Sequence, residues 1–312
     1  MTLGDFYATG DGVAQDVDEA VAWYRRAATQ GHTEAQMTLG DFYATGDGVA
    51  QDVDEAVVWY RRAAAQGHAE SLQWIRQAAE RGSVEAQASL GGLYITGEGV
   101  ARDADEAAQW VRLAAEQGHA EAQTTLGDLY AAGDGVAQDN VEAVRWYQQA
   151  AAQGVARAQL DLGDMYFRGQ GVGQDAAEGL RWFLLAAEQG YIPAQTNLAG
   201  MYANGRGVAQ DVNEAVRWYR MAAEQGLTEA MRWIRLTAEQ GSASAQFTLG
   251  VMYAEGGGVE RDETEALAWI NQAVTQGHIE AMAWVRMMAE GGNAEAQLTL
   301  GGMYFTGRGV ER

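Results

Sequence analysis

Residues 35–67 read AQMTLGDFYATGDGVAQDVDEAVVWYRRAAAQG, and the order of apolar residues in this stretch decides the fold. In its first half Ala35, Leu39 and Tyr43 stand four residues apart, which places them on one face of an α-helix. The second half has apolar residues at helical spacing too, at Ala56, Trp59, Tyr60, Ala63 and Ala64. The stretch therefore predicts two amphipathic helices joined by a short loop.

Glycine and aspartate mark where these two helices are expected to end and begin. Gly46 suits the left-handed residue that ends a helix, because a side chain would clash there. Asp52 and Glu55 have the spacing of a capping box, in which the aspartate accepts a first-turn N–H and the glutamate reaches back to the cap. Gly40 lies inside the first helix, where glycine costs about 1 kcal/mol relative to alanine, so we expect it to permit a close helix–helix approach. Gly67 closes the second helix.

The same pattern recurs along the whole chain. Tryptophan marks it at intervals of 36 or 15 residues, at Trp23, Trp59, Trp74, Trp110, Trp146, Trp182, Trp218, Trp233, Trp269 and Trp284. The leucine of the first helix recurs at intervals of 36 or 51 residues, at Leu3, Leu39, Leu90, Leu126, Leu162, Leu198, Leu249 and Leu300. One helix pair cannot bury its apolar stripes, whereas stacked pairs share a continuous core, so the sequence predicts an all-α solenoid.

The intervals divide the chain into helix-pair repeats of 36 residues and three single-helix inserts of 15 residues. We expect full units near 1–31, 32–67, 83–118, 119–154, 155–190, 191–226 and 242–277, inserts at 68–82, 227–241 and 278–292, and a partial unit at 293–312. Each insert has room for one helix of about 13 residues, roughly 20 Å long. A single helix leaves the chain at the opposite edge of the array, so we expect each insert to reverse the up-and-down order of the helices that follow.

These residues resemble the Sel-1-like repeat, a relative of the tetratricopeptide repeat, whose pattern runs roughly A-x-x-x-L-G-x-x-Y-x-x-G-x-G-V-x-x-D-x-x-x-A-x-x-W-Y-x-x-A-A-x-x-G. The resemblance covers 1–312 as one array. Phe183 and Ile270 depart from the pattern where tyrosine follows tryptophan, as does Ala199 in the Leu-Gly pair. The resemblance implies a right-handed α/α superhelix and a role as an adaptor for protein complexes, often in bacteria. It implies no catalytic residues.

Composition and charge narrow the function further. The chain has no cysteine, which excludes disulfides, zinc ribbons, iron–sulfur clusters and thiol nucleophiles. Its formal net charge of −22 repels phosphate backbones, so nucleic acid is not an expected partner. No apolar run reaches the length of about 18 residues that a membrane span needs. The start, MTLGDFYATG, has no signal region, which predicts a cytoplasmic protein, or a periplasmic or secreted one if the chain is a fragment.

Histidine is the residue that most invites a metal or catalytic site. The four histidines each follow the glycine between two units, at His32, His68, His119 and His278. They therefore fall in different units, and the recurring acidic residues already have capping roles. We expect no metal site, no cofactor and no catalytic residue.

Polar positions on the first helix of each pair remain as candidates for binding, because this helix lines the concave face of tetratricopeptide-like arrays. The candidate groove residues are Thr38, Asp41, Ser89, Thr125, Asp128, Asp161, Asp164 and Asn197. The aspartates among them predict an acidic groove and a basic partner. The alternative is an ordinary solvated face.

The sequence thus favours a scaffold that binds proteins or peptides through its concave face, and not an enzyme. An alternative is the targeting arm of a larger cell-wall or polysaccharide hydrolase whose catalytic domain is absent from this chain. A third is a purely structural product of repeat expansion. Apolar residues near the two ends lack neighbouring helices, which predicts end-to-end self-association; these are Leu3, Tyr7, Leu300, Met303 and Tyr304.

Overall fold

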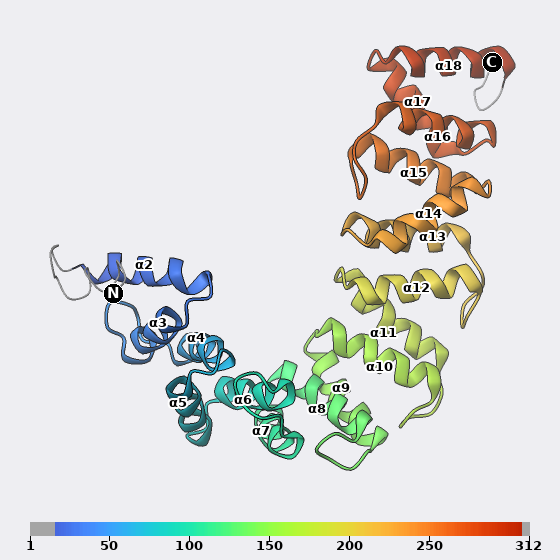
Figure 1. Ribbon diagram of the computed structural model, residues 1–312. Coiled ribbons are helices and arrows are strands. Elements are labelled where there is room, and N and C mark those ends of the chain that lie inside the picture. The colour runs from blue at the N-terminus through green and yellow to red at the C-terminus, as the bar shows by residue number, and fades with distance from the viewer. Residues whose placement is uncertain (1–15, 308–312) are drawn as a thin grey trace. The chain divides into compact units, whose positions relative to one another are not determined.

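The computed structural model describes residues 16–307 and divides the chain into two compact units, which we treat separately (Figure 1). The first unit comprises Met1–Ala158 with Gly169–Gly173, and the second Gln159–Arg168 with Gln174–Arg312. The described part of the chain holds 17 helices and no strand, which confirms the all-α class.

Within each unit, every helix packs against the next one along the chain, as expected of a solenoid. The helices of the first unit are α2 (Val17–Thr29), α3 (Thr33–Thr45), α4 (Val53–Ala65), α5 (Ala69–Glu80), α6 (Val84–Thr96), α7 (Ala104–Glu116), α8 (Ala120–Ala132) and α9 (Asn140–Ala152). Those of the second unit are α11 (Ala176–Glu188), α12 (Ile192–Asn204), α13 (Val212–Glu224), α14 (Thr228–Glu239), α15 (Ala243–Glu255), α16 (Glu263–Thr275), α17 (Ile279–Glu290) and α18 (Ala294–Thr306). Helix α10 (Ala156–Arg168) contributes residues to both units.

The predicted capping box is half right. In α4, Asp52 Oδ1 accepts the backbone N–H of Glu55 at 3.0 Å, as predicted. The glutamate does not reach back to the cap: Glu55 Oε1 accepts the indole N–H of Trp59 at 3.0 Å. The N–H of Asp52 instead donates to the carbonyl of Tyr43 at 2.9 Å, at the end of the preceding helix. That part of the prediction was wrong because the cap N–H already has a partner and the tryptophan lies one helical turn from the glutamate.

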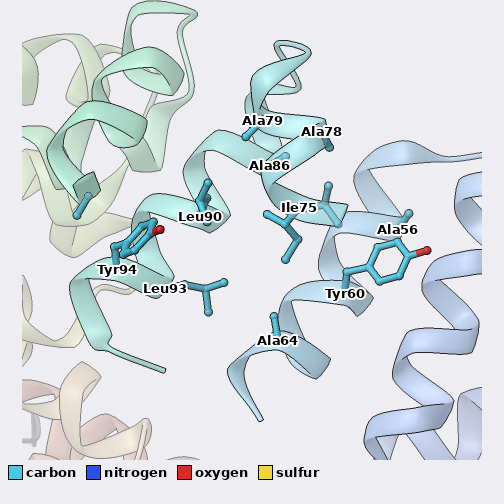
Figure 2. Packing of buried hydrophobic residues seen from close by; sticks show 12 residues of the cluster. Ala56, Tyr60, Ala64, Ile75, Ala78, Ala79, Ala86, Leu90, Leu93 and Tyr94 are labelled. Carbon is cyan, nitrogen blue, oxygen red and sulfur yellow. The ribbon is translucent and has the colours of Figure 1, made fainter. Parts of the chain in front are cut away.

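The core lies between the apolar stripes of neighbouring helices. Gly40 does permit close approach, since a Cβ there would lie 2.7 Å from the ring of Tyr60. Figure 2 shows Tyr60, Ile75 and Leu90, which α4, α5 and α6 contribute to one buried cluster. Among the tryptophans, Trp59 is buried whereas several others are only half buried at the edge of the core.

Buried glutamines link each pair to its predecessor. Gln36 donates to the carbonyl of Ala28 at 3.0 Å and accepts from Gln66 at 2.7 Å. The second contact recurs at the same spacing of 30 residues in Gln117–Gln87, Gln153–Gln123, Gln189–Gln159, Gln225–Gln195 and Gln276–Gln246. These bonds satisfy polar groups that would otherwise be buried without a partner.

The inserts are single helices, and their effect on direction is visible at the loops. At a regular junction, Gly135 lies over the carbonyl of Ala104, at the start of α7. After the insert α5, the corresponding Gly99 lies over the carbonyl of Ala64, at the end of α4. Helix α4 also packs directly on α6. Because the loop after α6 meets the opposite end of the preceding helix, α4 and α6 run in the same direction, which is the predicted reversal.

Candidate functional site

A hollow of about 570 Å³ lies between α6 and α8, the first helices of consecutive pairs, and we call it the α6–α8 hollow. Ser89 and Gly92 line it from α6, while Thr125 and Asp128 line it from α8. The other charged or ionisable residues of its lining are Arg61, Glu85, His119, Glu121 and Arg157. The structure therefore brings three of the predicted groove residues together on one face of the first unit.

The other predicted residues are dispersed. Asp164 and Asn197 line a second hollow of about 370 Å³ between α10 and α12, in the second unit. Thr38, Asp41 and Asp161 line neither hollow. The predicted row is thus divided among separate places along the array.

The aspartates of this row already have partners within the protein. Asp128 accepts hydrogen bonds from the hydroxyl of Tyr147 at 2.8 Å and from Arg157 at 2.5 Å. Burial raises the pKa of Asp128 above its ordinary value, although both hydrogen bonds act in the opposite direction. Asp41 accepts from the hydroxyl of Tyr60 at 2.6 Å. The α6–α8 hollow consequently carries charges of both signs, where the sequence predicted an acidic row.

A histidine–carboxylate pair forms part of this wall. His119 Nε2 lies 3.2 Å from Glu85 Oε2, while His119 Nδ1 accepts the backbone N–H of Ala122 at 3.1 Å. These two partners assign the neutral tautomer with its proton on Nε2. The hydrogen bond to Glu85 raises the pKa of His119, and the same bond lowers the pKa of Glu85.

The other histidines share the structural half of this arrangement. Each accepts an N–H in the first turn of its helix through Nδ1, from Ala35, Ser71 or Ala281. A position that repeats before each helix thus indicates a capping role. Within residues 16–307, no group of three or more acidic or histidine side chains could hold a metal ion.

Sequence reasoning missed Arg61, Glu85, His119 and Arg157 as neighbours in the hollow. One signal was available. Glu85, Glu121 and Arg157 occupy the same repeat position, 36 residues apart, and the charge changes sign at the third. A change of sign at one position of an otherwise regular repeat indicates a new partner, which here is Asp128.

Comparisons with known proteins identify the repeat. The Sel1 repeat of the family models matches residues 3–32, 33–68, 69–83, 84–119, 120–155, 156–191, 192–227, 227–242, 243–278 and 294–312. A comparison with curated proteins gave no match. Among the described helices, none is long and apolar enough to cross a membrane.

Solved structures with related sequences agree. A protective antigen with an SLR fold from uropathogenic Escherichia coli is 34% identical, with 99% of this chain and 72% of that chain covered and a TM-score of 0.49. A Sel1 repeat protein from Oxalobacter formigenes is 38% identical, with 72% and 85% covered and a TM-score of 0.48. An immunity protein from Pseudomonas aeruginosa is 21% identical, with 70% and 81% covered and a TM-score of 0.40. On the repeat matches and the sequence identities, the chain belongs to the Sel1 repeat family.

Proposed function

We propose that this chain is a protein-interaction scaffold whose α6–α8 hollow binds an extended segment of a partner protein. Sel1 repeat proteins are generally protein-interaction scaffolds. The observation that carries the proposal is the hollow itself, about 570 Å³ between consecutive first helices and bordered by charged groups. Repeat arrays expose surfaces of this kind for binding.

The charges of the hollow suggest a partner segment of mixed charge. Arg157 offsets Asp128, and His119 engages Glu85. Glu121, which is exposed at the rim, is the position that a basic side chain of the partner would face. Opposite charges across an interface set specificity and association rate more than affinity.

The same contacts favour binding over catalysis. In the tautomer assigned above, His119 uses Nδ1 to cap α8 and donates its Nε2 proton to Glu85. Neither ring nitrogen is left with a lone pair to accept a proton from a substrate. A general base needs such a lone pair within hydrogen-bond reach of the proton it removes.

Filling the hollow should abolish binding. We expect Thr125→Trp to weaken the binding of peptides selected by display on the immobilised 312-residue chain by about tenfold or more, since an indole occupies space that a bound segment needs. Fluorescence anisotropy with the synthetic peptides measures the change.

Thr38→Trp is the matched control. Thr38 stands at the same repeat position on α3, is half exposed like Thr125, and bonds its own helix in the same way, at 2.8 Å against 2.9 Å for Thr125. It does not line the hollow. Peptides that bind both variants as tightly as the unmodified chain would reject the α6–α8 hollow as the binding site.

Self-association is a second, separate proposal, and the residues that support it differ partly from those expected. Leu300 and Met303 pack into the core between α16 and α18. Leu298 and Phe305 are the exposed residues, at 79% and 89%. Leu3 and Tyr7 lie outside the described residues.

We expect the 312-residue chain to associate as its concentration rises, and Leu298→Asp with Phe305→Asp to suppress this, because a charge opposes burial of that face. Sedimentation equilibrium measures the effect. Ile279→Asp removes an equally apolar side chain, 75% exposed, from α17 and serves as control. A chain that stays monomeric throughout, or an equal effect of the control, would contradict the proposal.

A further inference from the structure

Arginines two residues after tryptophan share one contact in this protein. Each donates to the hydroxyl of the tyrosine 18 residues later, on the next first helix: Arg25 to Tyr43, Arg76 to Tyr94, Arg112 to Tyr130 and Arg235 to Tyr253. The Arg112 contact measures 2.9 Å. This contact is therefore part of how one pair is fastened to the next.

Arg61 stands at the same position but has lost this partner. It follows Trp59 by two residues, and the residue 18 positions later is Ala79, inside the insert α5. The insert supplies its own arginine, Arg76, which takes Tyr94. Arg61 is thus released by the insertion of a helix, although nothing has changed in its own helix.

The released side chain lines the α6–α8 hollow. Arg61 is exposed, and its Nη2 lies 3.7 Å from the place where Gly92 would carry a Cβ. It is close enough to Glu85 to lower the pKa of that carboxyl, yet the hydrogen bond of Glu85 goes to His119. Over the part of the chain that the structure describes, no hydrogen bond or ion pair engages Arg61.

The second insert shows what an arginine released in this way binds. Arg220 follows Trp218 by two residues, and α14 occupies the position of its tyrosine. Arg220 lies 2.7 Å from Glu224 and 3.6 Å from Glu255, so two carboxylates have replaced the tyrosine.

The first insert lacks these carboxylates. The residues that correspond to Glu224 and Glu255 beside Arg61 are Ala65 and Thr96, each 159 positions earlier, as Arg61 is to Arg220. Thr96 lines the α6–α8 hollow. The guanidinium of Arg61 therefore faces the hollow without the built-in acids that its counterpart has.

We infer that Arg61 is an anion-recognition residue, which binds a carboxylate of the partner segment in the α6–α8 hollow. The inference rests on the proposed function. A guanidinium presents a planar fork of donors that matches a carboxylate, and such charged pairs are the strong hydrogen bonds of interfaces. The carboxylate belongs to an aspartate or glutamate side chain, or to the C-terminus of the partner.

The test uses the display-selected peptides described above as probes, with the full chain. Arg61→Gln should weaken their binding by about tenfold or more, the usual scale for losing a charge-assisted pair. Thr96→Glu, which supplies the acid that Glu255 provides at the second insert, should weaken binding similarly while leaving Arg61 in place. Arg25→Gln, at the same repeat position but away from the hollow, should leave binding unchanged.

Altered peptides identify the source of the carboxylate. A peptide with a C-terminal amide, and one with asparagine or glutamine in place of its acids, should each be measured on the unmodified chain and on Arg61→Gln. The peptide lacking the recognised carboxylate should bind both proteins equally weakly.

The outcomes separate the two proposals. If Thr125→Trp abolishes binding while Arg61→Gln and Thr96→Glu change it less than about threefold, the hollow is the site and the role of Arg61 is wrong. If Thr125→Trp also has no effect, the proposed function fails first. Circular dichroism spectra should be the same for all variants, because the substituted residues lie at the surface of the hollow.

Discussion

Gly99→Ala is expected to lower the free energy of unfolding by about 3 kcal/mol or more. Gly99 has φ +70°, a left-handed conformation that side chains rarely adopt. A Cβ there would also lie 2.7 Å from the carbonyl carbon of Ala64, and closer still to its oxygen. That neighbour is backbone, so it cannot turn aside as a side chain would. The substitution therefore forces the loop after α6 away from the end of α4.

Gly67→Ala separates the two contributions. Gly67 has φ +89°, but a Cβ there would meet nothing within 4 Å. Its loss should be only the cost of the left-handed conformation, about 1–2 kcal/mol. Urea denaturation followed by circular dichroism compares the variants, and hydrogen exchange of α4 to α7 locates the effect, since repeat arrays need not unfold in one step. Equal losses for the two variants would show that the contact with Ala64 contributes nothing.

Ile75→Ala should destabilise the first unit by about 2–5 kcal/mol. Ile75 is the central side chain of the insert helix α5, 0% exposed, and it fills the space between α4 and α6 (Figure 2). Removing three carbons leaves a cavity that the surrounding helices fill only partly. Protection of α4 and α6 amides in hydrogen exchange should fall together, because both helices pack on α5.

Two further variants calibrate this result. Ile75→Val removes one methyl group and should cost about 0.5–1.5 kcal/mol. Gln77→Ala, at an exposed position of the same helix, should change stability by less than about 0.5 kcal/mol. An Ile75→Ala loss no larger than that of Gln77→Ala would mean that α5 is attached at the surface and does not belong to the core.

The sequence was sufficient for the helices because the same local rule is written many times. Leu39 and Trp59 mark two apolar stripes, and repetition at 36 residues removes the ambiguity that one stripe alone would have. The direction reversal at α5 was also predictable, since it depends only on the number of helices. Glu55 was not: both the cap N–H and the indole of Trp59 lie within its reach, and the contact of Asp52 with Tyr43 decides between them.

The candidate site was only partly predictable. Ser89, Thr125 and Asp128 could be placed on one face from helical spacing. The charge of the hollow could not, because Arg157 reaches Asp128 from 29 residues away and Arg61 enters from α4. Such contacts depend on the stacking distance between helices and on side-chain reach, and neither is written in a single repeat.

The single-helix insert α5 has a consequence for how such a chain acquires new binding properties. Unequal recombination between near-identical repeats gains or loses short segments readily, and a gain of 15 residues preserves the contact that fastens the next pair, since Arg76 replaces Arg61 at Tyr94. The displaced arginine becomes available without any point mutation. Recombination in this family can therefore create a ligand-recognising side chain in one event, and later substitution at positions such as Thr96 then retains or silences it.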